Sequence, residues 1–163
     1  MSGSISLNQL LPAIKDVVDK GKEVSFTPEG TSMKPMLYGG RDEIVLIRPE
    51  FPLKKYDLPL YVRKNGSIVL HRVVKVLNKN GNTLYTMRGD NTYSDEPGIT
   101  NGQIVAVVSR FKRRGKWYEA SNNRYCAYVK LWCFIYPLRK TLRAIIRLPF
   151  RVVRKLKLLI KKP

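Results

Sequence analysis

The sequence predicts a mainly β domain with a short N-terminal helix and a C-terminal basic amphipathic helix. Between residues 22 and 111, Val, Ile, Leu and Tyr gather in short runs bounded by Gly, Pro, Asn or Asp, which is typical of strands. At both ends of the chain, apolar residues instead recur every three or four positions, as in helices. A length of 163 residues fits one ordinary domain.

The elements follow in order along the chain. Residues 7–20 predict an amphipathic helix, with Ser6 as its N-cap and Gly21 as its stop. Strands are then expected at residues 22–27, 43–48, 58–63, 67–77, 82–88 and 104–111. The pairs Asn65-Gly66 and Asn80-Gly81 suit tight hairpin turns, so residues 58–88 predict a three-stranded meander.

The charge divides the chain into two predicted regions. The net charge is +19, and residues 1–120 hold 19 Lys and Arg against all 12 acidic residues. Residues 121–163 hold 12 Lys and Arg and no acid. We therefore expect a domain over 1–120 and a basic tail over 121–163, joined by a hinge at 120–124.

The tail predicts contact with an anionic membrane surface. Aromatic residues crowd 125–138, where Pro137 bends or ends the helix, and beyond them basic residues recur every fourth position beside an aliphatic stripe. A tail without acids favours the cytoplasmic face, with peripheral attachment. The alternatives are packing on the β domain and nucleic-acid binding; the aliphatic stripe makes nucleic acid the weaker of the two, because phosphate binding needs charge alone. Cys126 and Cys133 are expected to be reduced thiols.

Three segments carry candidate chemistry. Ser32 lies in a turn bounded by Gly30 and Pro35, and His71, the only histidine, lies within the predicted strand 67–77. The loop Gly89–Asp95 places carboxylates after the next strand. A serine needs a base to take its proton, and histidine titrates near neutral pH. Each residue alone is more often structural, so the ordered combination carries the prediction.

This combination resembles the signal peptidase I and LexA-type serine peptidase clan. The resemblance rests on residues 30–35, 55–57, 70–74 and 89–95 and spans about residues 26–110. Bacterial leader peptidases and LexA-type proteins use a Ser/Lys dyad, whereas His71 stands here at the lysine position. The chain is thus similar to the Ser/His type found in endoplasmic-reticulum and archaeal signal peptidases.

The resemblance implies that Ser32 is the nucleophile and His71 the general base. The third member should follow Gly-Asp-Asn by several residues, which favours Asp95, with Glu96 as the alternative and Asp90 organising the loop. Backbone N–H groups in the serine turn are candidates for the oxyanion hole. The family often places a hydroxyl two positions before the nucleophile, where this chain has Gly30, followed by Thr31.

The implied function is a serine endopeptidase that cleaves a leader, signal or precursor peptide, bound in extended conformation, through an acyl-enzyme. Neither a cofactor nor a metal is expected. The alternative is a non-catalytic membrane- or peptide-binding module that keeps the fold.

Overall fold

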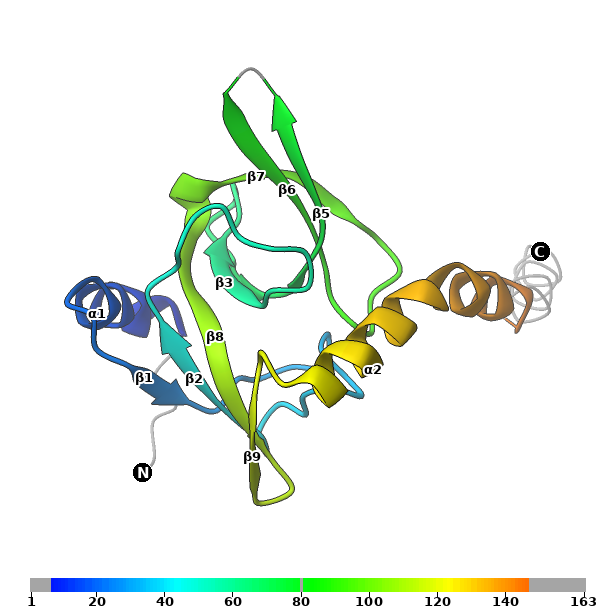
Figure 1. Cartoon of the computed structure of the whole chain (residues 1–163), viewed down its shortest axis with the longest axis horizontal. Coiled ribbons are helices and arrows are strands. Elements are labelled where there is room, and N and C mark those ends of the chain that lie inside the picture. The colour runs from blue at the N-terminus through cyan, green and yellow to red at the C-terminus, as the bar shows by residue number, and fades with distance from the viewer. Residues whose placement is uncertain (1–6, 80, 147–163) are drawn as a thin grey trace, which may run out of the picture.

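The protein is mainly β, with two antiparallel sheets and a helical segment at each end (Figure 1). The computed structural model describes residues 7–79 and 81–146. The elements are α1 (Leu7–Asp19), β1 (Val24–Phe26), β2 (Glu43–Ile47), β3 (Pro59–Val62), β4 (Ile68–Leu70), β5 (Arg72–Lys79), β6 (Asn82–Arg88), β7 (Glu96–Thr100), the 3-10 turn Asn101–Gln103, β8 (Ile104–Arg113), β9 (Lys116–Glu119) and α2 (Asn123–Phe134).

The larger sheet has the order β1-β2-β8-β3-β4, with β9 paired to β8. The smaller sheet has the order β5-β6-β7. All described pairs are antiparallel, and β8 is the long central strand that joins β2 to β3. Strands β1 and β4 are therefore the two edges of this path, and each keeps one side without a strand partner.

The expected meander over 58–88 is wrong. The predicted strand 67–77 divides at His71 into β4, which pairs with β3, and β5, which pairs with β6 in the other sheet. Asn65-Gly66 lies between β3 and β4, and Gly81 lies between β5 and β6, with φ of 81° at Gly66 and 76° at Gly81; Asn80 lies outside the described residues. The chain thus forms two hairpins in two sheets, and His71 lies where it passes from one sheet to the other.

The other expected elements agree closely with the structure. The helix predicted over 7–20 is α1, and its proposed cap Ser6 lies outside the described residues. Strands at 22–27, 43–48, 58–63, 82–88 and 104–111 correspond to β1, β2, β3, β6 and β8. Strands β7 and β9 were not expected from the pattern.

The C-terminal helical segment packs on the β domain. The side chain of Asn122 accepts hydrogen bonds from the N–H groups of Arg124 and Tyr125 and so caps α2. Tyr125 and Val129 are buried in the same core as α1 and the larger sheet. After a turn at Ile135, residues 136–146 are again helical (Figure 1). Helix α2, which follows the boundary expected at residue 120, thus shares a core with the β domain.

No helix within the described ranges combines the length and the apolar character that crossing a membrane requires. The tail predicted to contact a membrane continues through residues 147–163, which lie outside those ranges.

Candidate active site

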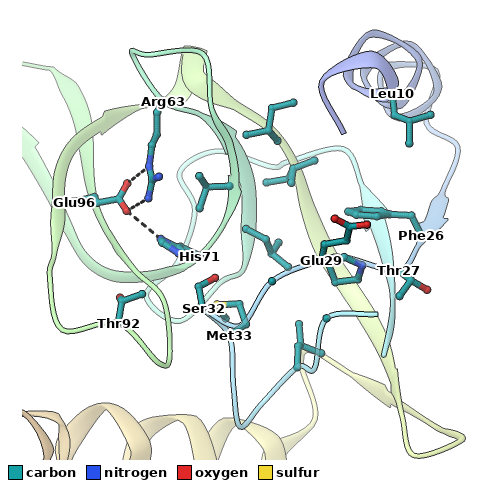
Figure 2. Close-up of a pocket in the computed structure, with 18 of the residues that line it drawn as sticks. Leu10, Phe26, Thr27, Glu29, Ser32, Met33, Arg63, His71, Thr92 and Glu96 are labelled. Carbon is teal, nitrogen blue, oxygen red and sulfur yellow. Dashed lines mark hydrogen bonds and ion pairs between the residues drawn. The ribbon is translucent and has the colours of Figure 1, made fainter. Parts of the chain in front are cut away.

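A cavity of about 650 Å³ opens between the two edges of the larger sheet (Figure 2). Phe26 of β1 lines one side, and Ile68, Val69 and Leu70 of β4 line the other. Ser32 and His71 both line this cavity, although 38 residues separate them in the chain. The fold thus brings the predicted nucleophile and base to one site.

Ser32 is held by a turn whose ends are anchored in the core. Gly30 adopts a φ of 91°, which glycine tolerates. The neighbouring backbone is packed so closely that a Cβ atom on Gly39 would lie 2.4 Å from the Gly30 oxygen. Met33 and Leu37 are 5% and 1% exposed, so the turn is pinned on its inner side. Ser32 remains half-buried at the cavity wall.

His71 is fixed by its place between β4 and β5. Its side chain is almost fully buried, and its backbone N–H donates to the Pro59 oxygen at 3.4 Å. The sequence placed this residue in the middle of a continuous strand, whereas it lies at the break between two strands. That position lets the ring face the cavity while both neighbouring strands stay paired.

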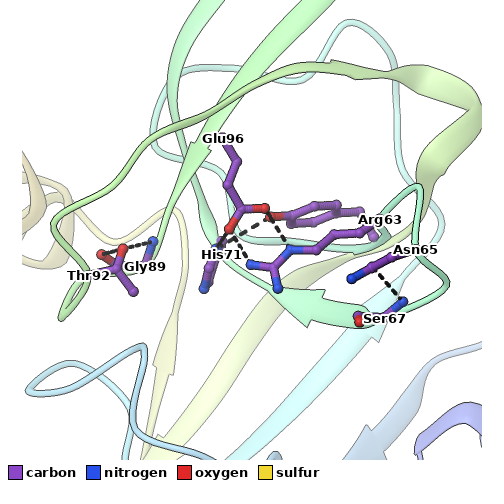
Figure 3. A network of polar contacts seen from close by, with 8 residues as sticks. Arg63, Asn65, Ser67, His71, Gly89, Thr92 and Glu96 are labelled. Carbon is purple, nitrogen blue, oxygen red and sulfur yellow. Dashed lines mark hydrogen bonds and ion pairs between the residues drawn. The ribbon is translucent and has the colours of Figure 1, made fainter.

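Glu96, and not Asp95, faces His71 (Figure 3). Glu96 Oε1 lies 3.3 Å from His71 Nδ1, whereas Asp95 points to Arg88, with Oδ1 3.2 Å from Nη1. The preferred assignment of Asp95 as the third member is therefore wrong in its geometry. The alternative that the sequence left open, Glu96, occupies that position.

Tyr61 and Arg63 hold the Glu96 carboxylate. Arg63 donates to both carboxylate oxygens, with its Nε 2.8 Å from Oε2. The Tyr61 hydroxyl donates to Oε2 at 2.8 Å and lies 3.4 Å from His71 Nδ1. Both groups next to Nδ1 are thus acceptors toward the ring, which favours the tautomer with hydrogen on Nδ1 and a free lone pair on Nε2.

The electrostatics keep His71 neutral and Glu96 charged. Burial lowers the pKa of His71 below its ordinary value of 6.5, the Glu96 charge raises it in part, and Arg63 lowers it again. Burial alone would raise the pKa of Glu96, but hydrogen bonds from Arg63 and Tyr61 bring it below its ordinary value. At neutral pH the ring is therefore a proton acceptor beside a carboxylate.

The loop Gly89–Thr92 joins the serine turn to the histidine. The Asn91 N–H donates to the Ser32 carbonyl oxygen at 2.7 Å, and its side-chain amide donates to the Thr31 oxygen at 3.2 Å. A Cβ atom on Gly89 would lie 2.7 Å from the Ser32 oxygen and 2.9 Å from His71 Nε2. Only glycine fits there, and Nε2 is the ring nitrogen that faces the serine turn.

Asp90 organises this loop, as the sequence suggested. It forms a bidentate pair with Arg72, at 2.8 and 2.6 Å, and both residues are buried. Arg72 also donates to the Tyr56 oxygen and to the Tyr125 hydroxyl. All of these contacts lie behind the site, so the pair fixes the loop without facing the cavity.

The serine turn contains two backbone N–H groups without an acceptor. Among the described residues, the N–H groups of Ser32 and Met33 donate to no other group, so they remain the candidates for an oxyanion hole. Gly30 has no side chain to contribute, and Thr31 is exposed. Within the same ranges, no group of three or more His, Cys, Asp and Glu residues is placed to hold a metal.

Sequence reasoning missed Tyr61 and Arg63. A signal was present, because Tyr61 and Arg63 lie two positions apart in the predicted strand 58–63 and should share a face, although β3 itself ends at Val62. A buried tyrosine followed two positions later by an arginine calls for a carboxylate partner. The pattern did not indicate which acidic residue supplies this carboxylate.

No protein-family model matches this chain, and a search of curated proteins finds no match.

Proposed function

We propose that this protein is a serine endopeptidase with a signal-peptidase/LexA-like fold. Ser32 is the nucleophile, His71 the general base and Glu96 the acid that orients the base. The observation that carries this proposal is a buried neutral histidine whose Nδ1 faces a carboxylate and whose Nε2 faces the serine turn. The ordered motifs of the sequence support the same assignment.

The reaction follows from these positions. Ser32 Oγ attacks the carbonyl carbon of the scissile bond while His71 Nε2 accepts its proton. Glu96 stabilises the imidazolium, and the N–H groups of Ser32 and Met33 bind the oxyanion. The tetrahedral intermediate collapses as His71 returns the proton to the leaving amine. Water, activated by the same base, then hydrolyses the acyl-enzyme.

The substrate in this proposal is an extended peptide segment of a leader, signal or precursor protein. The edges β1 and β4 both border the cavity, and a free strand edge binds an extended peptide through backbone hydrogen bonds. Met33 and Leu37 add apolar wall to the cavity beside Ser32. By resemblance to the clan, small residues precede the scissile bond.

A non-catalytic peptide-binding module is the competing function. The observation that favours it is that, among the described contacts, no hydrogen bond joins the Ser32 hydroxyl to the His71 ring. Catalytic hydrogen bonds often form only when substrate is bound, so this observation does not exclude the peptidase. In Figure 2 the two side chains lie at the same end of the cavity.

A fluorophosphonate probe separates the two functions, because it reacts with an activated serine. We expect the probe to label the wild type and not Ser32→Ala, and the labelling rate of His71→Ala to fall by about 100-fold or more. Ser94→Ala is the matched control, since Ser94 also lines the cavity, and it should label like the wild type. A folded wild type without labelling, or labelling that survives in Ser32→Ala, would contradict the proposed serine peptidase activity.

A further inference from the structure

One face of the C-terminal helical segment contacts the β domain. Trp132 Nε1 and Arg139 Nη2 donate to the Asp90 carbonyl oxygen at 3.0 and 3.1 Å. The Arg139 guanidinium lies 3.5 Å from the centre of the Trp132 ring. Arg143 lies over the Tyr93 ring at 4.2 Å. These contacts fix the rotation of the helical segment about its axis.

A second face of the helical segment is apolar and open to water. Its residues recur at intervals of three and four, so they form one stripe along the helical segment. The exposed fractions are 60% for Leu131, 80% for Phe134, 61% for Leu138, 49% for Leu142, 60% for Ile145 and 63% for Ile146. We call these six residues the apolar stripe. A continuous exposed stripe of this kind marks an interaction surface.

A cationic groove of about 500 Å³ adjoins the stripe. Lys55, Arg88 and Lys130 line it together with Leu131 and Phe134. Within the described ranges, neither Lys55 nor Lys130 pairs with a carboxylate. The last acidic residue of the sequence is Glu119, so no negative charge follows it along the helical segment.

We propose that the apolar stripe and the cationic groove together dock on an anionic lipid bilayer, with the helical segment in the plane of the headgroups. A bilayer surface presents anionic phosphates above apolar acyl chains. The apolar stripe would contact the acyl chains, and the lysines of the cationic groove would contact the phosphates. A folded protein partner would need an apolar groove that accepts the stripe and acidic residues placed opposite Lys55 and Lys130. An anionic bilayer supplies both apolar and negative contacts without such a match, so the positive charge of the groove favours the bilayer.

This docking would set the active site beside the membrane. The face of the helical segment that carries Trp132 and Arg139 holds the Asp90 loop, and that loop contacts the Ser32 carbonyl oxygen through Asn91. Figure 2 shows the C-terminal helix passing below the loop of Thr92 and the turn of Ser32. A peptide emerging from the membrane surface would thus meet the cleft, whether or not Ser32 is catalytic.

Vesicle flotation of the full chain tests the docking. The vesicles are phosphatidylcholine alone or phosphatidylcholine with phosphatidylglycerol, and the protein carries Ser32→Ala so that catalysis plays no part. We expect at least tenfold tighter binding to the anionic vesicles. Phe134→Asp with Leu138→Asp should weaken that binding at least tenfold. Phe51→Asp with Leu77→Asp adds the same two charges at exposed apolar residues elsewhere, which are 44% and 45% exposed, and binding should stay within twofold.

A second pair of variants tests the groove. Lys55→Gln with Lys130→Gln should reduce the preference for anionic vesicles more than Lys64→Gln with Lys116→Gln, which removes the same charge from other exposed positions. Unchanged binding in the Phe134/Leu138 variant would overturn the docking surface, because residues 147–163 alone would then suffice. An equal loss of the preference for anionic vesicles in both lysine variants would contradict the role of the groove, because net charge alone would then explain the binding.

Discussion

Asp90 and Glu96 lie six residues apart, and each pairs with an arginine, yet the two pairs have different surroundings. The Asp90–Arg72 pair is buried, and Arg72 is also bonded to Tyr56 and Tyr125. The Glu96–Arg63 pair borders the cavity and keeps one oxygen near His71. The comparison teaches that the first carboxylate is enclosed behind the loop, whereas the second, although it is held by Arg63 and Tyr61, also lies against His71 at the cavity.

The largest effect is expected where the buried pair is broken. Asp90→Asn leaves the Arg72 guanidinium buried without a counter-charge, which costs about 3–5 kcal/mol of unfolding free energy. Urea denaturation measures the loss. Asp95→Asn is the control, because the Asp95 side chain is 47% exposed and its removal should cost less than about 0.5 kcal/mol. Similar losses in both variants would show that the buried pair has no special role.

The catalytic side of the comparison is tested by Glu96→Gln. The change keeps the shape but removes the charge that stabilises the imidazolium, so the fluorophosphonate labelling rate should fall on the order of 100-fold. Asp95→Asn should change that rate less than about twofold, because it contacts Arg88 and not His71. The opposite ranking of the two variants would return the role to Asp95.

The pH dependence sharpens the assignment to His71. Because burial lowers the pKa of His71 below 6.5, the labelling rate should rise with pH and reach half its maximum below pH 6.5. Glu96→Gln removes a charge that raises this pKa, so the midpoint should move to still lower pH. A midpoint that moves upward, or does not move, would separate Glu96 from the titrating group.

The same shift acts on stability. The unfolded chain binds the His71 proton near pH 6.5 and the folded chain only at lower pH, so the unfolded state holds more protons between these values. The contribution of His71 to stability is therefore complete above pH 6.5 and is lost as the pH falls through the folded-state pKa.

Local pattern was enough to predict most strands, the N-terminal helix and the break before Pro137. Local pattern failed where pairing between residues far apart in the sequence determines the secondary structure. Residues 96–100 contain Pro97 and Gly98 and resemble a loop, but they form β7 because β6 pairs with them. The division at His71 is likewise set by long-range pairing, because residues 68–70 pair within the larger sheet and residues 72–79 pair within the smaller sheet.

The choice between Asp95 and Glu96 shows the same limit. Adjacent residues of an extended chain point to opposite sides, so the register decides which acid reaches the histidine. That register pairs Met87 with Glu96, a contact made across the sheet. The motif placed the proposed acid to within one residue, and only the strand pairing shows that Glu96 is the carboxylate beside His71.

The smallest expected effect concerns the link between the C-terminal helix and the buried pair. Trp132→Phe keeps an aromatic ring under Arg139 but removes the N–H that donates to the Asp90 oxygen, so it should cost about 1 kcal/mol. Thermal or urea unfolding measures it, with Leu131→Ala on the exposed face as the control. Because α2 contacts the Asp90 side of the loop, the labelling rate should change less than about threefold. A loss of labelling greater than threefold would show that the helix also acts on the proposed catalytic pair.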